Sequence, residues 1–589
     1  MGKMLEDYDH LLNIDFDRCY QIPFQQAEES VTAAGRETEK LDGIWNFAPD
    51  VYDTFIRKKF FEEVYQDEEG RDKPVDCNFD QWETVRVPSN WNLQKEKYWF
   101  FEGTGVYTRR FRFWKREEGE RVFLRVGAAN YECRVWLNGK LLARHQGGFT
   151  PFAVEITGHL KEDNRIILTV NNERKLEQIP SVNYDWFNYG GISRSVELIR
   201  VPGTFIKDFR IWLVPGSGFG RIGIWAQIAG DVLGKELRVE IPELGIRKRF
   251  LVHADGKAEG TVEAEPKLWS PENPKLYQVI VTCGNDRIEE QTGFREIRTE
   301  GKQVILNGKP IFLKGVCCHE ESLENGRVLT DQERLGILTE AKNMGCNIMR
   351  LSHYPHSERM AALADKVGMM LWEEIPVYWA LCFSQEEVYN NAQNQLKEMI
   401  IRDFNRPSVV IWGIGNENPD TDERLEFMKK LNDCSHGMDP SRLTAAACLV
   451  NIDKMQIIDR LCRYVDVVAI NEYYGWYYRD YDGLKEILEN SLLEKPLVIS
   501  ETGADSVQGH YGDEEELFTE NHQSKMYRKQ FEISDGYIAG IFPWILYDFR
   551  SPVRLNPLQD SFNRKGLMGA DKKYKKMAYE VVKEFYRHK

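Results

Sequence analysis

The sequence predicts a multidomain α+β protein with an N-terminal β jelly roll, an immunoglobulin-like β-sandwich and a C-terminal (β/α)8 TIM barrel. Three observations support this prediction. The 589 residues exceed what one hydrophobic core can organise, so several domains are expected. The first half carries many short apolar runs separated by turn signals, which is typical of β-sandwiches. The second half alternates apolar runs with helical patterns, which is typical of a parallel barrel.

Residues 1–202 are predicted to form the jelly roll, a scaffold or a weak sugar-binding module. Its strongest local signal is Asn138-Gly139, because this dipeptide accepts the positive φ angles of a two-residue hairpin turn. Residues 203–297 are predicted to form the immunoglobulin-like sandwich, since roughly seven strand-like runs fit that fold. The glycine-rich run 216–223 looks faintly like a phosphate-binding loop. No helical pattern follows it, so we interpret it as a hairpin turn.

Residues 298–589 are predicted to form the barrel. Apolar runs begin there near residues 311, 347, 369, 409, 444, 467, 496 and 540, with helical patterns between most of them. Eight such units are the number that closes a (β/α) barrel, and an open sheet seldom has so many. Barrels of this kind place their chemistry at the carboxyl ends of the strands. Function should therefore be sought among the polar residues that follow these runs.

Composition excludes several classes of function. The formal net charge is −15 and no basic stripe is present, which argues against nucleic-acid binding. No apolar run reaches the length of a membrane-spanning helix, and the first ten residues lack the apolar core of an export signal. The eleven cysteines are scattered without a CxxC pair, which is typical of reduced thiols. We therefore expect a cytoplasmic protein without a nucleic-acid or membrane partner.

Two glutamates end buried strands of the predicted barrel. Glu417 ends the run VVIWGIGNE and Glu501 ends the run PLVISE. The fourth and seventh strands lie on opposite sides of an eight-stranded barrel, so these side chains are expected to face each other across its mouth. A retaining glycosidase needs two such carboxyl groups, about 5 to 5.5 Å apart, flanking the bond that it cleaves. The sequence therefore predicts this chemistry.

The neighbours of the two glutamates suggest their roles. Asn416 lies beside Glu417 and can hydrogen-bond a sugar 2-hydroxyl. Glu417 is therefore the expected acid/base, with its pKa raised by the charge of Glu501. Glu501 is the expected nucleophile, kept ionised by donors such as Tyr473.

Other polar and aromatic residues of the barrel have simpler interpretations. His319, His353 and His356 form no HExxH motif, so we predict no metal site and no cofactor required for catalysis. Glu373-Glu374 is expected to anchor arginines such as Arg350. Four tryptophans are candidates for a sugar platform, with packing an equally good explanation of each: Trp372, Trp379, Trp476 and Trp544.

Motifs along nearly the whole chain resemble glycoside hydrolase family 2. In the first domain these are LDGIWNF from residue 41, VPSNW from 87, GVYTRRF from 105, WLNGK from 136 and HQGGFTPF from 145. In the barrel they are NGKPIFLKGV from 307, MRLSHYPHS from 349, RDFNRPSVVIWGIGNE from 402 and VISETGAD from 498. The resemblance implies the same fold, the same roles for Glu417 and Glu501, and a homo-oligomer (dimer or tetramer).

Within the family, the sequence resembles the β-glucuronidases. The resemblance is carried by DWFNYGGI from residue 185, NEYYGWY from 471 and SFNRKG from 561. It implies that Asn563 and Lys565 grip the carboxylate of the substrate, which would be a glucuronide conjugate or a glucuronate-containing oligosaccharide. It also places further residues in the sugar subsite: Asp185 (reaching it from the jelly roll), His353, Asn471, Tyr473, Tyr477 and Trp544.

Two features depart from the family pattern. The chain passes quickly into a helix after the third barrel strand, in LWEEIPVYWALCFSQEEVY, which predicts an open mouth that admits bulky aglycones. An arginine common a few residues before the Asn-x-Lys pair does not align without a gap, and Arg550 or Arg554 is the candidate to take its place.

Rival activities differ in the residues that they require. β-Galactosidase is disfavoured, because Thr502-Gly503-Ala504-Asp505 stands where a His-Ala-Met segment is typical. β-Galacturonidase, which also needs a carboxylate clamp, stays open, and a non-catalytic carbohydrate-binding protein is disfavoured because both glutamates are present. The natural aglycone and a surface ligand such as a flavin are left open.

Overall fold

The computed structural model describes residues 22–589 except 68, 479 and 492. The described chain divides into two compact units. The first comprises residues 22–30, 38–173 and 189–202, and the second comprises residues 31–37, 174–188 and 203–589. The segment 174–188, which contains Asp185, therefore groups with the barrel and not with the jelly roll.

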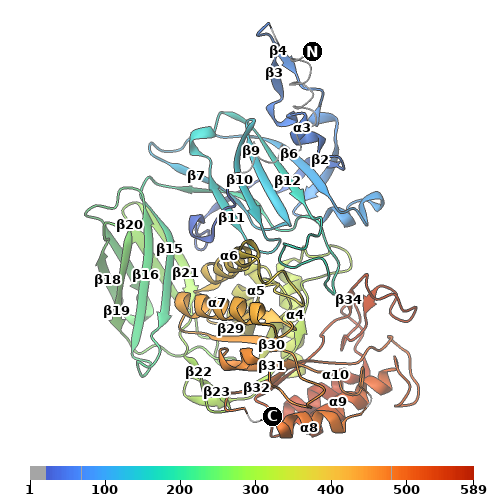
Figure 1. Cartoon of the computed structure of the whole chain (residues 1–589). Coiled ribbons are helices and arrows are strands. Elements are labelled where there is room, and N and C mark those ends of the chain that lie inside the picture. Colours follow the sequence, from blue (N-terminus) through green and yellow to red (C-terminus); the bar gives the residue numbers. More distant parts are fainter. Residues whose placement is uncertain (1–21, 68, 479, 492) are drawn as a thin grey trace. The chain divides into compact units, whose positions relative to one another are not determined.

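The first unit is a sandwich of two antiparallel sheets, as predicted (Figure 1). One sheet has the order β1 (Thr38–Lys40), β14 (Val196–Val201), β7 (Arg121–Val126), β11 (Phe152–Glu155). The other has the order β10 (Lys140–Gln146), β9 (Glu132–Leu137), β12 (Asp163–Asn171), β6 (Thr104–Arg112), β2 (Gly43–Asp50), β5 (Glu83–Val87). The hairpin predicted at Asn138-Gly139 joins β9 to β10, with φ angles of 51° and 84°.

The second unit begins with the predicted seven-stranded sandwich. One sheet contains β15 (Phe205–Leu213), β16 (Arg221–Ala229) and β19 (Lys257–Glu263). The other contains β18 (Ile246–Leu251), β17 (Glu236–Ile241), β20 (Tyr277–Cys283) and β21 (Asp286–Thr292). The glycine-rich run lies at the turn between the antiparallel strands β15 and β16, so its interpretation as a hairpin is confirmed. A small sheet, β22 (Ile297–Glu300), β23 (Gln303–Leu306) and β24 (Lys309–Ile311), leads into the barrel.

The barrel strands fall on the eight runs predicted from the sequence. They are β25 with β26 (Leu313–Lys314 and Cys317–Cys318), β27 (Ile348–Leu351), β28 (Met370–Glu374), β29 (Val409–Asn416), β30 (Leu443–Cys448), β31 (Val467–Asn471), β32 (Leu497–Thr502) and β33 (Gly540–Pro543). The segments β25 and β26 are two pieces of one strand. Because β25 pairs with β33 and β26 pairs with β27, both in parallel, the ring of strands is closed.

Helices follow most of the strands. They are α4 (Asp331–Met344), α5 (Glu358–Val367), α6 (Glu386–Asp403), α7 (Asp422–Met438), the short 3-10 helix η8 (Arg460–Arg463), α8 (Asp482–Asn490), α9 (Glu520–Ser534) and α10 (Met577–His588). Helices α8, α9 and α10 pack side by side (Figure 1). Local signals set the ends of α4, since Thr330 and Glu333 form a capping box and Gly345 ends the helix with a φ of 98°.

Burial in the barrel matches the sequence pattern. Every residue of β29 is buried, as expected for a parallel strand that is covered on both faces. Only residues 375–385 separate β28 from α6, so the short connection predicted after the third strand is confirmed. In the described part of the chain, no helix is both long and apolar enough to cross a membrane.

Gly315 lies between β25 and β26, where the barrel interior leaves no room for a side chain. A methyl group on Gly315 would lie 2.2 Å from Cδ1 of Phe542. We expect Gly315→Ala to lower the midpoint of urea unfolding by an amount equivalent to about 1–3 kcal/mol, because overpacking a closed core forces its neighbours to move.

The matched control is Gly336→Ala in α4. Gly336 is exposed, and an added methyl group would meet nothing within 4 Å. Alanine there should stabilise the helix by about 1 kcal/mol. An unchanged midpoint for Gly315→Ala would contradict the close packing described for this strand.

Candidate active site

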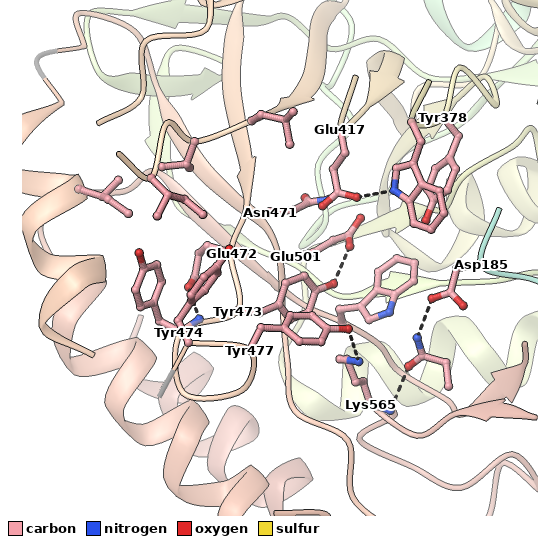
Figure 2. Close-up of a pocket in the computed structure, with 18 of the residues that line it drawn as sticks. Asp185, Tyr378, Glu417, Asn471, Glu472, Tyr473, Tyr474, Tyr477, Glu501 and Lys565 are labelled. Carbon is pink, nitrogen blue, oxygen red and sulfur yellow. Dashed lines mark hydrogen bonds between the residues drawn. The ribbon is translucent and has the colours of Figure 1, made fainter. Parts of the chain in front are cut away.

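A cavity of about 270 Å³ opens at the carboxyl ends of the barrel strands (Figure 2). Strands β29, β31, β32 and β33 each contribute a residue at or just beyond their ends: Glu417, Asn471, Glu501 and Trp544. The connection after β31 contributes Tyr473 and Tyr477, and the C-terminal segment contributes Arg554, Asn563 and Lys565. Asp185 completes this polar part of the lining. All of these residues belong to the second unit.

Glu501 is buried and receives two charged or polar donors. Nη1 of Arg350 donates to its Oε1 at 2.7 Å, and the hydroxyl of Tyr473 donates to its Oε2 at 2.7 Å. Both oxygens of the carboxyl group are therefore held in place. Figure 2 shows the Tyr473 hydroxyl directed at Glu501.

The electrostatics of Glu501 differ from the expectation of a group that its donors keep ionised. Burial raises its pKa from the ordinary 4.5 to about 8, and the nearby charge of Glu417 acts in the same direction. Arg350 and Tyr473 lower the pKa, but they do not offset the loss of hydration. Glu501 therefore holds a proton far more tightly than an exposed carboxyl group does.

Glu417 lies half-buried on the facing side of the cavity. Its Oε2 accepts a hydrogen bond from Nε1 of Trp379 at 2.8 Å and a longer one from Nδ2 of Asn416 at 3.4 Å. The backbone of Glu417 has a φ of 52°, in the left-handed region that residues with a side chain rarely adopt. Such strain persists where surrounding structure over-determines it, and it concentrates at functional sites.

Arg350, at the centre of the barrel, connects the groups beneath the cavity. Its fully buried guanidinium makes two bonds of 3.0 Å to Glu374, and it also donates to Oδ1 of Asn416 at 2.8 Å. The guanidinium lies 5.0 Å from the ring of Trp372. The expectation that Glu374 anchors Arg350 is confirmed.

Two of the predicted sugar contacts, Asn416 and His353, do not line the cavity. Oδ1 of Asn416 is already occupied by Arg350 and by Nδ2 of Asn471, the latter at 3.1 Å. Nδ1 of His353 lies 2.7 Å from Glu374, and its ring stacks on Trp544 with centroids 4.9 Å apart. Burial, with the charge of Arg350 adding to it, holds the pKa of His353 well below 6.5, so the ring is neutral. Both side chains lie one layer behind the cavity wall.

The C-terminal segment brings two cations to the cavity, and each already has a carboxylate partner. Nζ of Lys565 lies 2.6 Å from Oδ2 of Asp505. Nε of Arg554 donates to Asp185 at 3.1 Å, and Nδ2 of Asn563 donates to the same carboxylate at 3.2 Å. The hydroxyl of Tyr477 lies between the cations, 3.3 Å from Lys565 and 3.2 Å from Arg554.

The structure places Arg550 and Arg554, between which the sequence left the choice open, in different surroundings. Arg554 lines the cavity. Arg550 instead donates to the carbonyl oxygens of Ser322 and Leu323 and to the carboxylate of Glu321. Its side chain therefore secures a neighbouring loop.

Part of the lining was not expected from the sequence. Among the candidate tryptophans, Trp379 and Trp544 line the cavity, whereas Trp372 and Trp476 do not. The residues that sequence reasoning missed are Tyr378, Leu449, Val450, Ile452, Glu472, Tyr474, Tyr478 and Ile487. Most of them lie on the connections after β28, β30 and β31, and several are apolar. The position of these connections after barrel strands was the available signal, but it does not show which of their side chains point inward.

The described residues contain no group of three or more His, Cys, Asp or Glu side chains that could hold a metal ion. The ten described cysteines form no disulfide.

Family models match most of the chain. The TIM barrel domain of glycosyl hydrolases family 2 matches residues 297–588, and the sugar binding domain of that family matches residues 38–202. A third model of the same family matches residues 236–295. The chain belongs to glycoside hydrolase family 2. The expectation drawn from its motifs is confirmed, and the protein is a glycoside hydrolase.

Individual relatives resemble the chain over almost its whole length. A β-glucuronidase of Streptococcus agalactiae is 29% identical over 93% of this chain and 96% of its own. The structure of Bifidobacterium dentium β-glucuronidase complexed with coumarin-3-O-glucuronide is 26% identical, with a TM-score of 0.84, over 94% of this chain and 98% of that one. A family 2 β-galacturonidase from Eisenbergiella tayi, bound to glycerol, is 25% identical, with a TM-score of 0.79, over 95% and 98%.

The raised pKa of Glu501 predicts how the stability of the enzyme depends on pH. Because its pKa of about 8 in the fold exceeds the ordinary 4.5, its protonation stabilises the fold fully below pH 4.5, and this contribution is lost as the pH rises through 8. Glutamine stays neutral at every pH. We therefore expect Glu501→Gln to raise the thermal unfolding midpoint, by more at about pH 8 than at about pH 5.

The control is Glu494→Gln, which changes an exposed glutamate of the same barrel. This variant should show the same difference from the wild type at both pH values. A gain for Glu501→Gln that shrinks as the pH rises would contradict the raised pKa.

Proposed function

We propose that this chain is a retaining, exo-acting β-glucuronidase that hydrolyses β-D-glucuronides by double displacement. The observation that carries the proposal is the composition of one cavity. Two glutamates at strand ends line it. The C-terminal segment of the chain adds a lysine, an asparagine and an arginine to the lining. A pair of carboxyl groups suits cleavage of a glycosidic bond, and the cations suit a sugar that itself carries a carboxylate. Two of the relatives described above carry the name β-glucuronidase.

In the first step, an ionised Glu501 attacks the anomeric carbon while the bond to the aglycone oxygen breaks. Glu417 gives its proton to that oxygen, so the aglycone leaves as a neutral alcohol. The pair enters this step with its one proton on Glu417, and Arg350 and Tyr473 stabilise the Glu501 anion. In the second step, Glu417 removes a proton from water and the water oxygen attacks the same carbon. The bond between that carbon and Glu501 breaks, which frees the Glu501 carboxylate and releases glucuronic acid with retained configuration.

The part of the cavity that is lined by the C-terminal segment is proposed to bind the carboxylate of the uronate sugar. Lys565 supplies a compact positive charge, and Asn563 supplies a neutral donor. Asp185, Asn471, Tyr473, Tyr477 and Trp544, which line the same cavity, are proposed to contact the sugar ring.

Asn416 and His353 lie beside the two glutamates of the cavity. Nδ2 of Asn416 donates to Glu417 at 3.4 Å, and Nε2 of His353 lies 3.6 Å from Oε1 of Glu501. The contact of both residues with the sugar, expected from the sequence, stays part of the proposal.

The rival activities make different demands on this cavity. A β-galacturonidase would use the same uronate clamp and differ only in the orientation of the 4-hydroxyl group, and one relative has that name. A β-galactosidase would gain nothing from Lys565. A non-catalytic carbohydrate-binding protein would have no need for two glutamates in the cavity. Catalysis without a metal or cofactor, a cytoplasmic location and a dimeric or tetrameric assembly belong to the same proposal.

The role of Lys565 gives the proposal its test. The wild type should cleave 4-nitrophenyl β-glucuronide faster than the matching galacturonide and galactoside. In Lys565→Ala, kcat/KM for the glucuronide should fall by about 10- to 100-fold, which is the value of one charge-assisted hydrogen bond. Residual cleavage of the neutral galactoside should not fall, because that sugar has no carboxylate.

Lys573→Ala is the matched control. Lys573 is exposed and does not line the cavity, so its removal should leave all three rates unchanged. Full glucuronide turnover by Lys565→Ala would refute the carboxylate clamp, and a wild type that prefers the galactoside would refute the proposed activity.

A further inference from the structure

Asp505 lies four residues after Glu501 and contacts Lys565, which with Asn563 forms the proposed carboxylate clamp. Its side chain is fully buried and does not line the cavity. Oδ2 lies 2.6 Å from Nζ of Lys565, and Oδ1 accepts a hydrogen bond from the backbone N–H of Arg564 at 2.8 Å. One carboxylate thus connects the segment that follows the nucleophile strand to the segment that carries the clamp.

The surroundings of the Lys565 ammonium group disfavour its positive charge. Lys565 is only 1% exposed, so most of its hydration is lost. The groups that face it are the carboxylate of Asp505, the hydroxyl of Tyr477 at 3.3 Å, the guanidinium of Arg554, and the rings of Tyr473, Trp476 and Tyr477 with centroids 5.7, 5.4 and 5.1 Å away. Among the described groups that face the ammonium in this way, only Asp505 supplies a full negative charge.

The balance of these effects favours the charged lysine. Burial lowers the pKa of Lys565 and the charge of Arg554 lowers it further, but the attraction of Asp505 outweighs both and leaves the pKa above 10.5. Conversely, although burial raises the pKa of Asp505, contact with Lys565 leaves it below 3.8. Without a carboxylate at residue 505, the same burial would favour a neutral amine.

We propose that Asp505 is a specificity-determining positioning residue, which keeps Lys565 a cation at the cavity wall and thereby sets the preference for a sugar bearing a carboxylate. The inference rests on the proposed glucuronidase activity. Asp505 touches neither the sugar nor the reacting atoms, and it acts on the substrate only through Lys565.

A second contact allows the charge of Asp505 to be removed without releasing the backbone. Nε2 of Gln523, on α9, donates to the carbonyl oxygens of Ala504 at 3.0 Å, Lys565 at 3.2 Å and Gly566 at 3.2 Å. The two segments therefore remain joined by Gln523 when residue 505 is uncharged. Asparagine at residue 505 also keeps an oxygen that can accept from the N–H of Arg564.

The experiment compares KM for 4-nitrophenyl β-glucuronide in Asp505→Asn and in the wild type as a function of pH. We expect the ratio of the two KM values to increase about tenfold or more between about pH 6 and about pH 9, as Lys565 of the variant loses its proton. The KM for the neutral galactoside should keep a constant ratio. A glucuronide KM ratio that is independent of pH would overturn the inference.

Two further variants separate charge from structure. Asp548→Asn removes another buried aspartate, which is paired with Lys576 at 2.8 Å and bonded to the N–H of Gly566 at 2.8 Å, but Lys576 does not line the cavity. This control should leave the KM ratio independent of pH. Asp505→Glu keeps the negative charge, so its KM ratio to the wild type should also be independent of pH. This variant tests the role of the charge even if Asp505→Asn fails to fold. A rise with pH in either control would overturn the inference.

The outcome for the wild type keeps the two proposals apart. If the wild type does not prefer glucuronides, the proposed function fails. If it prefers them and Asp505→Asn shows no dependence of the KM ratio on pH, only the role of Asp505 fails.

Discussion

The buried guanidinium of Arg350 is the interaction on which the cavity depends. It occupies the centre of the barrel mouth and bonds to Glu374, Glu501 and Asn416 at once. A buried charge is tolerated only when it is paired and hydrogen-bonded, so these partners and the arginine require each other. Through Asn416 the network also reaches Glu417. One charge therefore orients both carboxyl groups that the proposed chemistry needs.

The same principle governs the other side of the cavity. Lys565 and Arg554 carry the positive charge that a uronate would need, yet each is already paired, with Asp505 and Asp185. A substrate carboxylate would therefore join ion pairs that already exist, and would not have to order free cations. Such preorganisation lowers the cost of binding, because the side chains do not lose freedom when the ligand arrives.

The sequence predicted the elements whose signals are local. The eight barrel strands, the Asn138-Gly139 hairpin and the positions of Glu417 and Glu501 at strand ends all follow from apolar runs and turn residues. The proposed roles of Asp185, Asn563 and Lys565 came only from the family resemblance, since nothing in their local pattern indicates a sugar site. The structure brings them to one cavity.

What the sequence could not predict depends on tertiary placement. The local sequence around Arg550 and Arg554 does not show which of the two enters the cavity. The path of the C-terminal segment decides it. Nor does the sequence show that Arg350 donates to Oδ1 of Asn416 and that Glu374 contacts Nδ1 of His353. The raised pKa of Glu501 was not expected, because burial, which opposes the effect of its donors, is not visible in a sequence.

Covalent trapping tests the central claim most directly. The enzyme would be incubated with 2-deoxy-2-fluoro-β-D-glucuronyl fluoride, and the labelled peptide would be identified by mass spectrometry. The double-displacement account predicts one uronosyl group attached to Glu501, and no label in Glu501→Gln. A label on a different residue, or hydrolysis of glucuronides with inverted configuration, would contradict it.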